Sequence, residues 1–71
     1  MKYYRRHVTV QIPADIAQAD HAAIYAKAAE LNSRFANDEG GSKNGCIESA
    51  AVAISKSGFG ACLVPGAVEI K

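Results

Sequence analysis

A chain of 71 residues forms one small domain, which buries only about 60% of the surface that its unfolded chain exposes. Eight basic and seven acidic side chains leave a formal net charge of +1, which excludes a global field that would attract nucleic acid or an anionic membrane. With 49% hydrophobic and 21% charged residues, the composition is that of a globular domain and excludes a disordered tail. We therefore expect a single domain over residues 1–71, for which dimerisation would add to a thin stability margin.

No stretch approaches the roughly 18 consecutive apolar residues of a membrane-spanning helix, and the opening residues, MKYYRRHVTV, contain no hydrophobic segment of the signal-peptide type. These features predict a cytoplasmic protein that makes no membrane contact. The two cysteines, Cys46 and Cys62, are too few for a disulfide scaffold.

The residues from Tyr4 to Ile12 alternate with a period of two, which predicts a β-strand with one apolar and one solvent-exposed face. Pro13 is expected to end it. The apolar face carries Tyr4, Arg6, Val8, Val10 and Ile12. The solvent-exposed face carries Tyr3, Arg5, His7, Thr9 and Gln11.

The next segment, residues 14–38, is rich in alanine and contains no glycine or proline, which predicts a helix. Asp15 and Asp20 are alternative N-caps, and the helix is expected to end near Asn37. Glu30 and Arg34 have the spacing of an exposed ion pair. The predicted buried stripe consists of Ile24, Ala28, Leu31 and Phe35.

Residues 46–55 (CIESAAVAIS) and 61–70 (ACLVPGAVEI) flank the short segment KSGFG, which predicts a β-hairpin. With a loop at residues 57–59, Ile54 lies opposite Cys62. One face of the hairpin then carries Ala50, Val52, Ile54, Cys62, Val64, Val68 and Ile70. The same register places Cys46 about 25 Å from the level of Cys62. A disulfide needs Cα atoms within about 7 Å, so we expect two free thiols.

The element order predicts an α+β fold of two layers and β-α-β-β type, in which one helix packs on one face of a three-stranded sheet. The helix returns the chain so that the second strand starts parallel to the first. The third strand then lies either in the middle or at an edge. Pro65 has no N–H to donate, which favours an edge or a bulge. The strand order stays open.

Catalytic candidates are few. Asp20 and His21 are neighbours early in the helix, but solvated surface positions account for both residues. The chain contains no G-x-S-x-G elbow, no H-E-x-x-H helix and no C-x-x-C pair. We therefore expect a protein that is not an enzyme and that uses no metal and no cofactor.

Residues 37–45 (NDEGGSKNG) are polar and rich in glycine, which predicts a loop. Ser42 and Lys43 invite comparison with a phosphate-binding loop, but the Gly-Lys pair of that motif is missing. The expected helix also precedes this loop, whereas phosphate sites use a helix that follows. The segment is interpreted as a flexible connection.

The sheet face opposite the helix is the candidate binding surface. The first strand supplies aromatic and basic groups to it, and the hairpin supplies short side chains that allow close approach. We predict that it binds a protein partner or a second copy of the chain. The predicted contact residues are Tyr3, Arg5, Arg6, His7, Ser49, Ala51, Ala53 and Leu63.

An alternative is a small protein that binds single-stranded nucleic acid, because Tyr3, Arg5 and Arg6 combine an aromatic platform with cations. Strand alternation sends Arg5 and Arg6 to opposite faces, and the RNP signature is absent. A protein partner is therefore the leading hypothesis, and nucleic acid is the alternative.

In size and style, one α+β domain of 71 residues without a catalytic signature is similar to the small inhibitor proteins of bacteriophages and mobile elements, the anti-CRISPR proteins among them. No motif carries this resemblance, so no residue is transferred from it. It implies a protein that occupies a surface on a larger host nuclease or effector complex, such as a CRISPR-Cas nuclease. Many such inhibitors are acidic mimics of nucleic acid, and this chain is not acidic.

Overall fold

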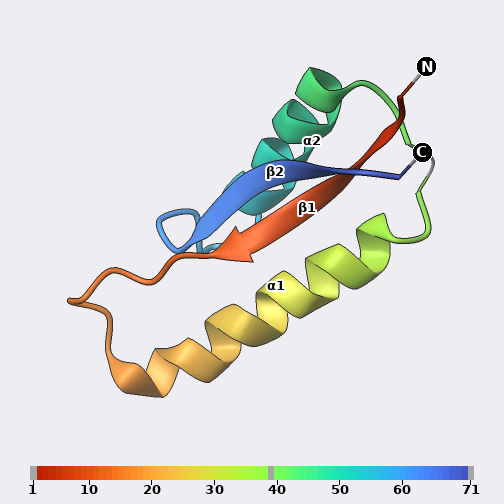
Figure 1. Cartoon of the computed structure of the whole chain (residues 1–71). Helices are drawn as coiled ribbons and strands as arrows, with labels where there is room; N and C mark the ends of the chain where they lie inside the picture. Colours follow the sequence, from red (N-terminus) through yellow and green to blue (C-terminus); the bar gives the residue numbers. More distant parts are fainter. Residues whose placement is uncertain (1, 39, 71) are drawn as a thin grey trace.

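The computed structural model describes residues 2–38 and 40–70 and has the element order β1, η1, α1, α2, β2. The elements are β1 (Tyr4–Val10), a single 3₁₀ turn η1 (Gln18–Asp20), α1 (His21–Phe35), α2 (Lys43–Ser55) and β2 (Leu63–Glu69). The α+β class is confirmed. The expected three-stranded sheet with one helix is wrong in detail, because the described residues form two strands and two α-helices (Figure 1).

The sheet is an antiparallel pair formed by the first and the last strand of the chain. Val10 lies opposite Leu63, Val8 opposite Pro65, and Tyr4 opposite Glu69. The backbone groups of Tyr4 bond Gly41 on the far side of β1, so the odd-numbered residues of β1 exchange hydrogen bonds with β2. Pro65 therefore occupies a position where the ladder needs no N–H. Of the two predicted places for Pro65, an edge strand or a bulge, the structure has the edge strand, since a two-stranded sheet consists of two edges.

The first helix follows the sequence prediction closely. It begins after Asp20, one of the two expected N-caps, and ends at Phe35. Its buried residues are the four predicted ones, Ile24, Ala28, Leu31 and Phe35. The helix packs against β1, and the polar surface includes Glu30, which lies 2.7 Å from Lys27 and 4.0 Å from Arg34. The hydrogen bond and charge of Lys27 lower the pKa of the Glu30 carboxyl.

The predicted hairpin is wrong, because residues 43–55 form helix α2 and not a strand. Ser42 caps this helix through its Oγ, which accepts a hydrogen bond from the Gly45 N–H at 3.1 Å. Its buried residues, Cys46, Ala50 and Ile54, recur every four positions. Gly58, with a φ of 86°, follows the helix and adopts the left-handed conformation that glycine favours at helix ends. The expected register of Ile54 opposite Cys62 therefore does not exist.

Both helices cover the same face of the sheet. Figure 1 shows α2 passing behind β2 and α1 running beside β1. The core between the sheet and the helices consists of Val8, Ile24, Ala28, Leu31, Phe35, Ala50, Ile54, Cys62 and Leu63. Both cysteines are free, as predicted, although the hairpin argument used for them fails, and both are buried.

The outer edge of β1 is closed by α1 and by the connection between the helices. The Asn32 side chain accepts a hydrogen bond from the Val8 N–H at 2.8 Å and donates one to the Val8 carbonyl at 3.0 Å. Gly41 forms the equivalent pair of backbone bonds with Tyr4, each 2.9 Å long. A Cβ atom at Gly40 would lie 2.8 Å from the Tyr4 carbonyl oxygen, so only glycine fits where this connection passes β1.

We expect Asn32→Ala to lower the free energy of unfolding by about 2 kcal/mol, because it leaves the partly buried N–H and C=O of Val8 without partners. Asn37→Ala is the matched control, since Asn37 is exposed and forms only a 3.5 Å bond to the Ser33 carbonyl. Urea unfolding followed by circular dichroism measures both variants. Equal effects of the two substitutions would contradict the role assigned to Asn32.

Candidate functional site

The face of the sheet turned away from the helices is the candidate site. Cross-strand neighbours lie on the same face, and the register places Arg5 beside Val68, His7 beside Gly66 and Thr9 beside Val64. The Ile70 N–H bonds the Tyr3 carbonyl at 2.9 Å, which extends the ladder by one residue. We define the open face as Tyr3, Arg5, His7, Thr9, Val64, Gly66 and Val68.

The open face combines apolar side chains with an arginine and a histidine. Tyr3, Val64 and Val68 are 48%, 38% and 37% exposed, which is high for large hydrophobic side chains. Gly66 leaves a notch between the two valines and beside His7, and a Cβ atom placed there would meet no atom closer than 3.8 Å.

The charge on this face is one-sided. Arg5 and His7 stand on it, and neither β1 nor β2 places a carboxylate there. Glu69 belongs to the opposite face by register and lies 3.9 Å from Lys2. The face can therefore accept an anionic group without displacing a carboxylate of its own.

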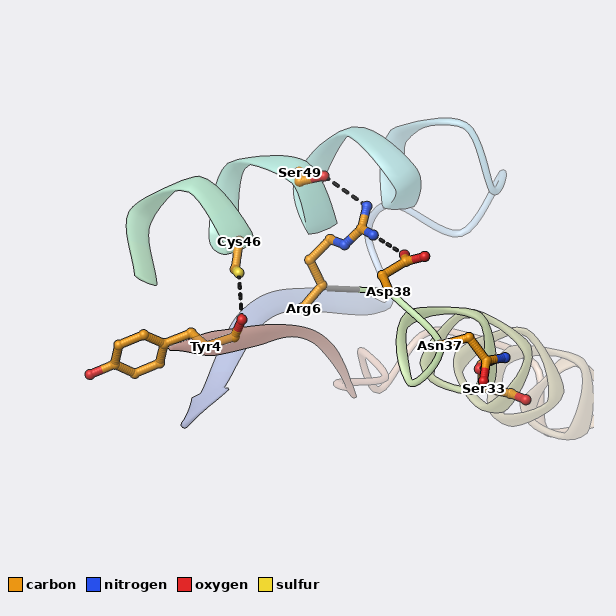
Figure 2. A network of polar contacts seen from close by, with 7 residues as sticks. All are labelled: Tyr4, Arg6, Ser33, Asn37, Asp38, Cys46 and Ser49. Atoms are coloured by element: carbon orange, nitrogen blue, oxygen red, sulfur yellow. Dashed lines mark hydrogen bonds and ion pairs between the residues drawn. The ribbon is translucent and has the colours of Figure 1, made fainter. Parts of the chain in front are cut away.

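Arg6 lies on the helix-covered face and is held on three sides. Figure 2 shows its guanidinium pointing from β1 toward Ser49 of α2 and Asp38, which follows α1. It donates to the Ser49 Oγ at 3.0 Å and pairs with the Asp38 carboxylate. It also lies 4.7 Å from the centre of the Phe35 ring, within cation–π range. These contacts tie β1 to both helices and leave Arg6 outside the open face.

Besides Arg6, the other seven predicted contact residues divide into two groups. Tyr3, Arg5 and His7 lie together on the open face, as alternation along β1 indicated. The four residues expected from the hairpin do not join them, because three lie on α2 and the fourth is buried in the core at 4% exposure. These residues are Ser49, Ala51, Ala53 and Leu63.

Sequence reasoning missed Val64, Gly66 and Val68 as members of the open face. The expected hairpin register assigned both valines to the covered face and Leu63 to the open one. The true register pairs Leu63 with Val10, and this pairing turns the face of β2 over. Only knowledge of the partner strand could have revealed the correct assignment.

The candidate catalytic pair forms no recognisable constellation. Asp20 makes no capping bond, and His21 has a buried Nε2 without a hydrogen-bond partner in the described structure. Within residues 2–38 and 40–70, no three His, Cys, Asp or Glu side chains gather where they could hold a metal ion. In the same residues, no helix is both long and apolar enough to cross a membrane.

The loop predicted at residues 37–45 is shorter than expected, because α2 already begins at Lys43. The expectation that no helix follows this glycine-rich segment is therefore wrong. The Ser42 Oγ accepts a hydrogen bond from the Gly45 N–H, in the first turn of α2. Glu39 of this loop lies outside the described residues.

Comparison of the chain with known protein families, with curated proteins and with solved structures gives no significant match.

We expect substitution of the two neighbouring arginines to change the free energy of unfolding by different amounts. Arg6→Lys removes a planar group that binds Ser49, Asp38 and Phe35 at once, and we expect it to lower the free energy of unfolding by about 1 kcal/mol. Arg5→Lys, on the open face, should change it by less than about 0.5 kcal/mol. Urea midpoints test both, and a loss of stability in Arg5→Lys as large as in Arg6→Lys would refute the division of the two side chains between faces.

Proposed function

We propose that this protein is a small binding module, without catalytic activity, that recognises a protein partner through the open face. The observation that supports this function is the combination of two exposed valines with Arg5 and His7 on one uncovered sheet surface. Apolar groups supply contact energy, and charged and polar groups fix orientation and choice of partner. An inhibitor that occupies a larger effector complex, which the size and style of the chain suggest, would use this face in the same way.

The partner docks on the face and does not add a third strand. The outer edge of β1 already bonds Asn32 and Gly41. The outer edge of β2 carries Pro65, which has no N–H to donate to a new ladder. Since strand addition depends on a row of free backbone groups, side-chain contacts on the open face are the remaining mode for the sheet.

The partner carries carboxylates beside apolar side chains. A second copy of the chain bound face to face would oppose Arg5 and His7 with no anion from either strand. Two strands of seven residues present a footprint of about 230 Å². A stable interface between folded proteins buries about 800 Å² per partner. A short acidic and apolar segment of another protein therefore suits the open face better than a dimer does.

Nucleic acid is the competing partner. Tyr3 and Arg5 remain available for stacking and phosphate contact, but Arg6 is already engaged by Asp38 and Ser49. One cation and one ring make a weak platform, because single-strand binders interleave several of each.

Selection from a random peptide library displayed on phage tests the proposal. We expect enrichment of peptides in which aspartate or glutamate flanks large apolar residues. Synthetic copies of these peptides should lose at least tenfold in affinity for Arg5→Glu and for Val68→Lys, because each change removes one half of the recognition chemistry.

Matched controls come from the helices. Arg34→Glu reverses an exposed charge on α1, and Val52→Lys replaces a 54% exposed valine on α2, so both should bind like the wild type. Failure to enrich any peptide family, or equal binding by the open-face and helix variants, would overturn the proposal. Salt-dependent binding of a single-stranded oligonucleotide that disappears in Arg5→Glu would favour nucleic acid in its place.

A further inference from the structure

A cavity of about 190 Å³ lies between the start of α1 and the connection from α2 to β2. None of its lining residues belongs to the open face. They come from the approach to α1, from α1 itself and from residues 58–62. The lining consists of Ile16, Asp20, Ile24, Gly58, Phe59, Ala61 and Cys62.

Both walls of this cavity are held by hydrogen-bonded turns. On one side, the Ser57 Oγ accepts a bond from the Phe59 N–H at 3.0 Å and donates one to the Ile54 carbonyl at 2.6 Å. The Cys62 N–H then closes a turn on the Phe59 carbonyl at 2.9 Å. On the other side, the Ile16 N–H bonds the Pro13 carbonyl at 3.2 Å. The cavity is therefore present before any ligand binds, which lowers the ordering cost of binding.

The chemistry of the lining is apolar with one charge. Ile24 and Cys62 are buried side chains of the core, and Ile16 and Phe59 are half-buried groups packed against it. Asp20 supplies the only charged side chain of the lining, and its side chain makes no helix-capping bond. We propose that this cavity binds a small organic cation, an ammonium group carried on a compact apolar or aryl body.

Size and charge both point to this class. A cavity of about 150 Å³ lined by aliphatic and aromatic residues accepts benzene, so the present cavity has room for one aromatic ring and a short substituent. Phe59 offers an aromatic surface to a ring or a cation, and Asp20 offers a counter-charge. An anionic ligand would meet repulsion from the same carboxylate.

Benzylammonium is the probe that tests the proposal on the whole chain. At an efficiency per atom between that of the best very small ligands and that of drug-sized ones, its eight non-hydrogen atoms give a dissociation constant on the order of 1 mM. Titration followed by two-dimensional NMR should move the resonances of Ile16, Ile24 and Phe59 and leave those of Arg5 and His7 in place. Benzyl alcohol, its neutral counterpart, should bind about threefold more weakly, as the loss of an exposed ion pair implies.

Two variants separate the charge from the cavity. Asp20→Asn should abolish the difference between the two probes, while Asp15→Asn, a neighbouring carboxylate outside the lining, should preserve it. Ala61→Leu places a larger side chain at an exposed lining position and should weaken both probes at least fivefold. No saturable binding of benzylammonium, or equal binding of the two probes by the wild type, would overturn the proposal. Neither result bears on the open face.

Discussion

The antiparallel pairing of the first and last strands is the interaction on which the rest of the molecule depends. A two-stranded sheet is marginal by itself in water and needs a packed layer to persist. Here the pairing brings Val8 and Leu63, which are far apart in the sequence, into one apolar surface that both helices cover. The helices are attached to this ribbon by polar contacts as well, through Asn32 at the edge of β1 and Arg6 beneath it. Removing the strand pairing would leave either helix without a surface to pack on.

The helices cover one face of the sheet and leave the other uncovered. Strand addition is also hindered at the outer edges of both strands. Asn32 and Gly41 occupy the outer edge of β1, and Pro65 interrupts that of β2. These are the means by which small β-containing proteins avoid unwanted strand addition. The uncovered surface of the sheet is the open face, where two exposed valines stand beside Arg5 and His7 and neither strand adds a carboxylate. The fold therefore leaves one face of the sheet uncovered and decides which side chains stand on it.

The sequence prediction is accurate where the pattern that carries it is local, and fails where long-range packing decides the structure. Alternation in β1 and the helical spacing of Ile24, Ala28, Leu31 and Phe35 are local patterns, and both assignments are confirmed. Residues 46–55 were assigned to a strand because a short apolar run with β-branched residues suits a buried strand as well as a helix. The deciding signals were present but weak: Ser42 in the N-cap position, and Cys46, Ala50 and Ile54 at a spacing of four. Tertiary packing resolved the ambiguity in favour of the helix.

The residues that β1 contributes to the open face can be predicted from the sequence, whereas those that β2 contributes cannot. Tyr3, Arg5 and His7 share a face through the geometry of one strand, which alternation reveals without any knowledge of the fold. Val64 and Val68 join them only through the register with β1, a contact between residues almost a whole chain length apart. A shift of that register by one residue would bury both valines and expose Leu63. The chemistry of the face is thus decided by a single long-range pairing. The same pairing sets Arg5 on the open face, while Arg6 on the covered face connects the two helices to the sheet.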